Sequence, residues 1–217
     1  MKNLSSLLIL LFLFAACAQE ISEEYSHDIE ELFPEISLSE ELNLYVDEDG
    51  QPADGHYSTT YRDGSTLADI TFRDGMITEG EIFREDGYRT TGYNTENGMM
   101  THTIYAEDDQ PRLISVFGDD LADRREFHVW YEDGTRFVES DQTINRMWYE
   151  SGQLQSEVPL KNGRMDGKAV FWYENGEVKA ENHFTDDEMD GTFTEWDEEG
   201  NIIRERVYDM GELVSGE

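Results

Sequence analysis

Basic residues are scarce in this 217-residue chain, which has 16 Lys and Arg against 50 Asp and Glu and a formal net charge of −34. Nucleic acid is therefore excluded as a natural partner, because phosphate binding requires clustered Lys and Arg side chains. Anionic lipid headgroups are disfavoured as a direct partner for the same reason. Apolar residues make up 37% of the chain, which is low for a globular protein but too high for a fully disordered one.

Cysteine and long apolar runs are almost missing as well. Cys17 is the only cysteine, so no disulfide can form within the chain. A helix that spans a bilayer needs about 20 apolar residues, and no segment after Cys17 has such a run. The one apolar stretch, from Leu7 to Ala16, is too short to span a membrane.

That stretch has the features of a secretory signal peptide, because Lys2 precedes the apolar run and small residues end it. The segment Phe14-Ala-Ala-Cys17 resembles the lipobox of bacterial lipoproteins, in which the cysteine becomes the lipidated first residue. We therefore predict a signal peptide over 1–16 and a lipid anchor at Cys17. The anchor would hold the chain on the bacterial cell envelope, at the outer membrane, on either its periplasmic or its surface face. A plain cleaved signal peptide is the alternative.

The segment that follows the anchor is strongly acidic. Residues 18–61 carry 13 acids and no Lys or Arg. No strand-like alternation is present before about Asn43, and like charges that repel one another keep a chain extended. We therefore predict an acidic, flexible tether over 17–43, with one helical turn at Asp28–Phe33 before Pro34.

Glycine punctuates the rest of the chain. Eight Asp-Gly and three Asn-Gly dipeptides account for 11 of the 18 glycines. These dipeptides favour two-residue hairpin turns, because both central residues of such turns need positive φ angles. The stretches between them are rich in aromatic and β-branched residues, so the pattern predicts a run of short antiparallel strands.

The strands also repeat, with a period of about 24 residues. Trp148, Trp172 and Trp196 are 24 residues apart, and two series of glycines and glutamates keep the same spacing. One hairpin cannot bury an apolar face alone, so the units must stack into a continuous sheet. The period is clear over 144–211 and 50–98 and degenerate over 99–147.

The segments Asp166–Gly176, Asp190–Gly200 and Asp54–Gly64 carry a resemblance to a known family. Each places an aromatic pair or its equivalent between Asp-Gly and a later glycine, as the bacterial variant of the MORN repeat does. The resemblance implies an all-β fold, an elongated antiparallel meander of stacked hairpins, over 44–217. Many such chains are grouped as YwqK-like antitoxin components of toxin–antitoxin modules, and this grouping implies a partner protein that is bound and neutralised.

No catalytic constellation stands out in the sequence. The chain lacks a Gly-x-Ser-x-Gly nucleophile motif and a phosphate-binding loop, and its one cysteine is assigned to the anchor. The five histidines are too dispersed for a local metal site. They are His27, His56, His102, His128 and His183. We therefore expect no enzyme and no cofactor. Weak Ca²⁺ capture by acidic turns is an alternative without the usual loop spacing.

The repeated tryptophans and glutamates are the candidate binding residues. Alternate residues of a strand share a face, so a 24-residue period should align them in ladders. A stacking surface for a ligand competes with simple cross-strand packing of the tryptophans. For the glutamates, capture of a basic partner competes with a solvated acidic face. The set comprises Trp130, Trp148, Trp172, Trp196, Glu157, Glu181 and Glu205.

The sequence leads to one main function and two alternatives. The main hypothesis is a non-enzymatic, lipid-anchored envelope module that binds or scaffolds a protein partner. The partner is expected to be basic, and the membrane is contacted only through the lipid on Cys17. The first alternative is a YwqK-like antitoxin or immunity partner of a cognate toxin. The second is an enzyme that acts on envelope glycans through two converging carboxylates.

Overall fold

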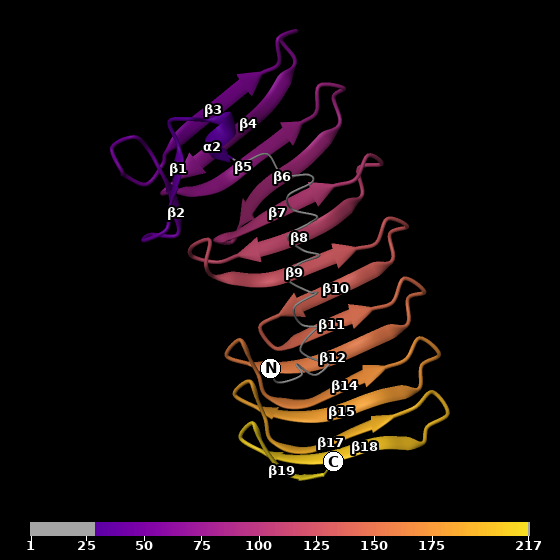
Figure 1. The fold of residues 1–217 in the computed structure, drawn as a ribbon. Helices are drawn as coiled ribbons and strands as arrows, with labels where there is room; N and C mark the ends of the chain where they lie inside the picture. Colours follow the sequence, from indigo (N-terminus) through magenta and orange to yellow (C-terminus); the bar gives the residue numbers. More distant parts are fainter. Residues whose placement is uncertain (1–28, 217) are drawn as a thin grey trace. The chain divides into compact units, whose positions relative to one another are not determined.

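The computed structural model describes residues 29–216 and divides the chain into two compact units, Met1–Arg124 and Arg125–Glu217 (Figure 1). We call them unit 1 and unit 2. The expected signal peptide, the anchor at Cys17 and residues 17–28 of the expected tether lie outside the described residues. The described part is built almost entirely of antiparallel strands, as predicted.

The sheet of unit 1 is a meander in which each strand pairs with the next along the chain. Its six strands are β3 (Gly55–Thr60), β4 (Thr66–Arg73), β5 (Met76–Phe83), β6 (Arg89–Glu96), β7 (Met99–Tyr105) and β8 (Pro111–Phe117). Strand β4 shows the period-2 alternation clearly, because Ala68, Ile70 and Phe72 are buried while Asp69 between them is exposed. One face is therefore apolar and the other polar.

A short N-terminal layer covers part of the apolar face of this sheet. It consists of α2 (Ile29–Leu32), β1 (Ser37–Ser39) and β2 (Leu44–Val46), with β1 and β2 paired. Its apolar residues Ile29, Phe33 and Ile36 join one buried cluster with residues of β4 and β5. The rings of Phe33 and Tyr57 lie 5.8 Å apart in a T-shaped contact.

This packing corrects the predicted tether. Residues 29–43 are folded and are not an extended spacer, although the helical turn before Pro34 is confirmed. The acid count obscured an apolar pattern in which Ile29, Phe33 and Ile36 are four and three residues apart. All three are buried in the cluster with β4 and β5, although only Ile29 lies in α2, and this burial outweighs the repulsion between exposed carboxylates.

Unit 2 continues the same hairpin design. Its main strands are β9 (Arg124–Trp130), β10 (Arg136–Asp141), β11 (Ile144–Trp148), β12 (Leu154–Lys161), β14 (Gly167–Trp172), β15 (Val178–Thr185), β17 (Gly191–Trp196), β18 (Ile202–Asp209) and β19 (Glu212–Gly216). Each pairs antiparallel with its neighbour. Two-residue strands β13 (Arg164–Met165) and β16 (Glu188–Met189) extend the hairpins of β12 and β15. Residues 99–147, where the sequence repeat is degenerate, therefore still form antiparallel strands.

The glycine-containing turns are of two kinds, and only one matches the prediction. At Asp74-Gly75, Asn97-Gly98 and Asn162-Gly163 both residues have positive φ, as two-residue hairpins require. At the opposite hairpin ends only the glycine does, as at Gly176, whose N–H donates to the Tyr173 carbonyl. There a preceding Asp or Asn fixes the turn: the Asn175 side chain accepts the Glu177 N–H at 2.9 Å.

A tyrosine before the second kind of turn ties successive hairpins together. The hydroxyl of Tyr149 donates to the Trp172 carbonyl at 2.9 Å, and that of Tyr173 donates to the Trp196 carbonyl at 2.8 Å. The same bond joins Tyr131 to Trp148. Partial burial raises the pKa of Tyr173, and the neighbouring Glu195 raises it further, so the hydroxyl remains a donor near neutral pH.

Removal of one such hydroxyl tests this tie. We expect Tyr149→Phe to lower the free energy of unfolding by about 1 kcal/mol, because the Trp172 carbonyl loses its donor. Urea titration followed by tryptophan fluorescence measures the change. Tyr88→Phe is the matched control, because this ring is 51% exposed and we expect a change near zero. Equal effects in the two variants would contradict the assigned role.

Candidate functional site

The three repeated glutamates lie in one row across unit 2. Glu157 is directly opposite Val170, which is opposite Glu181. Glu181 is in turn opposite Thr194, and Thr194 is opposite Glu205. Because directly opposed residues share a face of a sheet, the three carboxylates lie on one face, as the 24-residue period predicted. We call this the outer face of unit 2.

Basic side chains compensate two of these carboxylates. Arg146 Nε donates to Glu157 at 2.8 Å, and Lys168 Nζ lies 2.7 Å from Glu181. Within residues 29–216, Glu205 has no ion pair and is exposed. The row is therefore mixed in charge and is not a uniform acidic face. Such partly exposed pairs contribute at most about 1 kcal/mol each to stability.

The four tryptophans follow the same face, each at the end of a strand. Trp148, Trp172 and Trp196 are half-buried, and each lies beside a register shift of its strand pair. Their cross-strand partners are aliphatic, namely Leu154, Val178 and Ile202. Trp130, which is also half-buried, pairs instead with Arg136, whose guanidinium lies 5.5 Å from the Trp148 ring.

The tryptophans and their aliphatic partners therefore form one stripe, which we call the tryptophan stripe. Cross-strand packing accounts for the buried part of each ring, and the remainder is open to solvent. The stripe runs beside the glutamate row. The arrangement offers a partner aromatic contacts next to mixed charges.

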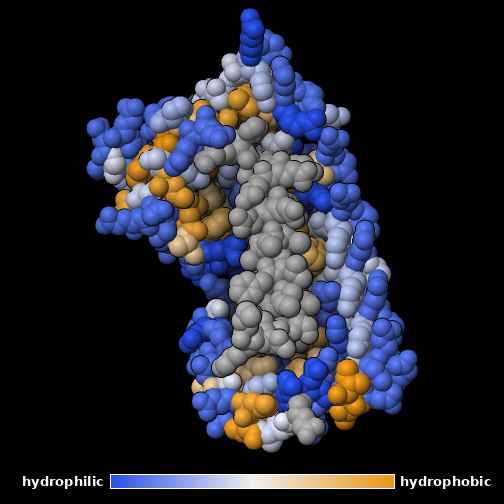
Figure 2. Space-filling view, in the orientation of Figure 1, coloured by the Kyte–Doolittle hydropathy of each residue, from blue (hydrophilic) through white to orange (hydrophobic). Residues whose placement is uncertain are grey.

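Apolar side chains are most exposed at the end of unit 2. Strand β19 pairs only with Arg206–Asp209 of β18, so Ile202 and Ile203 lie beyond its reach and are 59% and 56% exposed. Leu213 and Val214 of β19 are also exposed. Figure 2 shows hydrophilic side chains over most of the visible surface, with apolar patches near β18 and β19. Unpaired strand edges with apolar side chains are favourable places for association.

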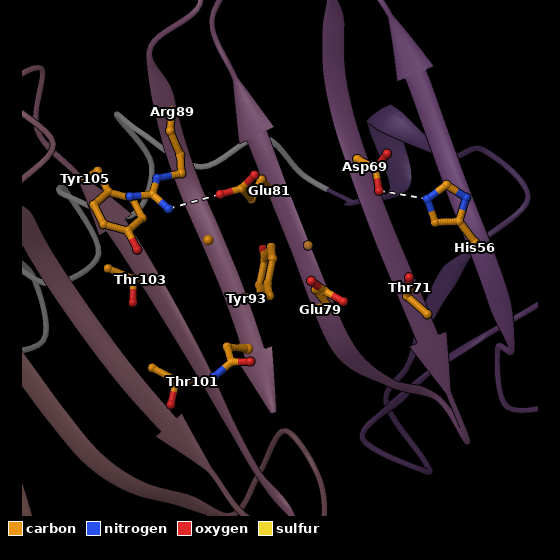
Figure 3. A pocket seen from close by; sticks show the side chains of 13 residues that line it. His56, Asp69, Thr71, Glu79, Glu81, Arg89, Tyr93, Thr101, Thr103 and Tyr105 are labelled. Carbon is orange, nitrogen blue, oxygen red and sulfur yellow. Dashed lines mark hydrogen bonds and ion pairs between the residues drawn. The ribbon is translucent and has the colours of Figure 1, made fainter. Parts of the chain in front are cut away.

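Unit 1 has a hollow of about 490 Å³ on the polar face of its sheet (Figure 3). Two rows of directly opposed residues form its floor. One row runs Thr71, Glu79, Asn94 and Thr101. The second row comprises Asp69, Glu81, Gly92 and Thr103.

Ion pairs border this hollow on two sides. On one side, His56 Nε2 lies 2.7 Å from Asp69 Oδ1. On the other, Arg89 contacts Glu81 at 3.0 Å and Asp109 at 2.8 Å. The guanidinium of Arg89 also lies 4.0 Å from the Tyr105 ring centroid, within the range of a cation–π contact.

The opposite face of the same sheet carries a second histidine, His102, which is buried and, in the described part of the chain, has no carboxylate partner. His102 stacks on Tyr93, with ring centroids 4.8 Å apart and an interplanar angle of 10°. Burial lowers the pKa of His102 to about 4, so the ring is neutral at pH 7. Its Nε2 has no hydrogen-bond partner within residues 29–216. We interpret His102 as a packing residue.

Among residues 29–216, no group of three or more His, Cys, Asp or Glu side chains is arranged to hold a metal ion. Over the same range, no helix is long and apolar enough to cross a membrane. The candidate binding features of residues 29–216 are the outer face of unit 2 and the hollow of unit 1.

Sequence reasoning found the first feature but missed the second. The glutamates and tryptophans repeat at a fixed period, whereas the hollow collects residues of β3 to β7 that share no motif. One signal was available, since Gly92 interrupts a strand without any turn residue beside it. A glycine inside a strand often marks a close approach, and here a Cβ at Gly92 would lie 3.1 Å from the Tyr105 ring.

Comparison with known proteins identifies the repeats. A search of curated proteins finds no significant match. The family model described as the MORN repeat variant matches three consecutive segments, 144–162, 165–186 and 189–210. These segments begin at β11, β13 and β16, so each covers one structural repeat of the hairpin array. The three successive hairpin repeats over 144–210 therefore match the MORN repeat variant.

Proposed function

We propose that this chain is a non-enzymatic, lipid-anchored module of the bacterial envelope that binds a protein partner along the outer face of unit 2. The tryptophan stripe beside the glutamate row carries the proposal. Half-buried aromatic side chains supply much contact area at little entropic cost, and they dominate the energetics of protein interfaces. Repeat arrays commonly present such extended surfaces to partners.

Charge favours a partner with basic side chains. The chain has 34 more acidic than basic residues, so it attracts cationic surfaces at long range. On the outer face itself, Glu157 and Glu181 are compensated and Glu205 is not. A partner that places a basic side chain near Glu205 and an apolar one near Ile202 would match the end of the stripe.

The first arm of the test addresses binding. The photo-reactive residue benzoylphenylalanine is placed either at Glu157, on the outer face, or at Glu174, on a turn. We expect one specific cross-linked protein in envelopes only from the first position. Trp172→Ala should weaken its capture by about 30-fold, a typical loss for a central aromatic residue. Capture from both positions alike, or capture unchanged by Trp172→Ala in a folded variant, would exclude this face.

The second arm addresses the anchor. Cys17→Ser removes the thiol that would carry the lipid, so we expect the protein to move from the membrane to the soluble fraction. Ser22→Ala, five residues further on, is the control and should leave the fractionation unchanged. Persistence of the Cys17→Ser variant in the membrane fraction would show that another part of the chain holds it there.

A further inference from the structure

The tryptophans of the outer face of unit 2 recur at a fixed distance. Trp172 lies on β14 and Trp196 on β17, and β15 pairs with both strands between them. Because neighbouring strands of a sheet are about 4.8 Å apart, residues two strands apart in the same row are separated by about 9.6 Å. Trp148 on β11 precedes Trp172 by the same two steps. The tryptophan stripe therefore has a regular step of about 9.6 Å.

This step matches the period of a polyproline II helix. Such a helix has three residues per turn and rises about 3.1 Å per residue, so every third residue points the same way, about 9.3 Å further on. An extended strand places residues three apart on opposite faces. An α-helix returns to the same face after seven residues, about 10.5 Å further on. A proline-rich segment can therefore lay one proline on each tryptophan and stay in register.

The backbone at these tryptophans is held in place, while their rings are left open. The hydroxyls of Tyr149 and Tyr173 donate to the carbonyls of Trp172 and Trp196 at 2.9 and 2.8 Å. Within residues 29–216, neither of these two indole rings contacts another aromatic ring or a cation, and neither indole N–H makes a hydrogen bond. A polyproline II helix has no internal hydrogen bonds, so its carbonyls are free to accept. Each tryptophan thus offers an apolar surface to a proline and a donor to a carbonyl.

A free carboxylate lies beside the last tryptophan of the stripe. Glu205 is directly opposite Thr194, which precedes Trp196 by two residues on the same face. Glu205 is exposed and has no ion pair in the described part of the chain, whereas the other two glutamates of the row have basic partners. A basic residue next to the last proline of a ligand would meet this charge.

We propose that the outer face of unit 2 binds a polyproline II segment of a partner protein. Prolines three residues apart lie on Trp172 and Trp196, and a Lys or Arg lies beside Glu205. The proposal rests on the function proposed above, because it names the chemistry of the partner bound there. Aromatic-lined surfaces are a known way to recognise such segments. A neutral glycan could also stack on the rings, but it would gain nothing from the charge of Glu205.

Calorimetric titration of the full chain, kept in solution with a non-ionic detergent, tests the spacing. The probe is acetyl-Pro-Ser-Ser-Pro-Ser-Ser-Pro-Lys-Lys-amide, in which the prolines share one side of the helix. The control, acetyl-Ser-Ser-Ser-Ser-Pro-Pro-Pro-Lys-Lys-amide, has the same composition and charge but can lay only one proline on a tryptophan. We expect saturable binding of the probe and about tenfold weaker binding of the control, the loss of one aromatic contact.

Equal affinity for the two peptides would reveal only general attraction to an acidic chain and would overturn the proposal. Binding of cellohexaose, a neutral β-1,4-glucan, in place of the peptides would also overturn it. Specific cross-linking from Glu157 without binding of either peptide would leave the proposed function intact and remove this inference alone. The two failures are therefore distinguishable.

Two variants with matched controls locate the binding. Trp196→Ala should weaken binding of the probe about tenfold, with circular dichroism to confirm folding, while Tyr88→Ala removes a 51% exposed ring of unit 1 and should change nothing. Glu205→Gln should weaken binding about threefold, as expected for one exposed ion pair. Because Glu205 is exposed, this change does not disturb the core. Glu85→Gln removes an exposed carboxylate of unit 1 and should have no effect. Equal losses in a variant and its control would contradict the placement of the ligand.

Discussion

Phe72→Ala is expected to lower the free energy of unfolding of unit 1 by about 3–5 kcal/mol, the usual loss for a fully buried phenylalanine. The ring is 1% exposed. It lies 5.5 Å from both Tyr45 and Tyr57 in T-shaped contacts. Tyr45 belongs to the N-terminal layer and Tyr57 to the sheet, so Phe72 joins the two. Its removal would leave a cavity where the layers meet.

Urea unfolding and amide hydrogen exchange together measure this loss. Circular dichroism gives the unfolding midpoint, and hydrogen exchange resolved by peptide shows where protection is lost. We expect faster exchange in β2, β3 and β4. Phe72→Leu keeps most of the apolar volume and should cost only about 1 kcal/mol. A loss below 1 kcal/mol for Phe72→Ala would mean that residues 29–46 do not pack on β4 in solution.

The N-terminal layer marks where reasoning from composition fails. The nine acids from position 28 to position 49 favour an extended tether if net charge is weighed above pattern. Charge acts through water and is screened at distances beyond about 8–10 Å. Burial of Ile29, Phe33 and Ile36 acts by contact. A few buried apolar residues are therefore sufficient to hold an acidic segment on the sheet.

The repeat region could be predicted well, since its determinants are local. Strands alternate faces with period 2, so residues 24 apart in equivalent strands must share a face. This rule predicts that Glu157, Glu181 and Glu205 lie in one row, and the strand register confirms it. It did not reveal that Arg146 and Lys168 compensate two of them, because these bases occupy neighbouring strands without a repeat of their own.

The hollow could not be predicted in the same way. Its residues extend from His56 to Tyr105 over five strands, and no two of them form a recognisable motif. Its depth depends on the absence of a side chain at Gly92 and on the position of the Tyr105 ring. Both are consequences of how neighbouring strands are paired and twisted. Sequence periodicity indicates which residues share a face, but it does not show where that face is concave.

Gly75→Ala is expected to be among the most damaging single changes in unit 1, at a cost of about 2–5 kcal/mol. Gly75 has a φ of +79°, which costs a residue with a Cβ about 1–2 kcal/mol. An added Cβ would also lie 2.8 Å from the Tyr45 carbonyl oxygen and 2.9 Å from Leu44 Cβ. Forced overpacking of this kind costs a further 1–3 kcal/mol. The Gly75 carbonyl accepts the Tyr45 N–H at 2.9 Å, so the two segments cannot separate freely.

Gly98→Ala, also in unit 1, separates the cost of positive φ from the cost of overpacking by the added Cβ. Gly98 has nearly the same φ, +77°, in an Asn-Gly turn of the same kind, but nothing lies within 4 Å of an added Cβ. We expect this variant to pay only the backbone cost, about 1–2 kcal/mol, in urea titrations followed by circular dichroism. The excess loss in Gly75→Ala then measures how tightly β2 packs against the β4–β5 turn. If the two variants lose equal stability, β2 shifts at little cost to make room for the added Cβ. The N-terminal layer would then be held by Ile29, Phe33 and Ile36 alone.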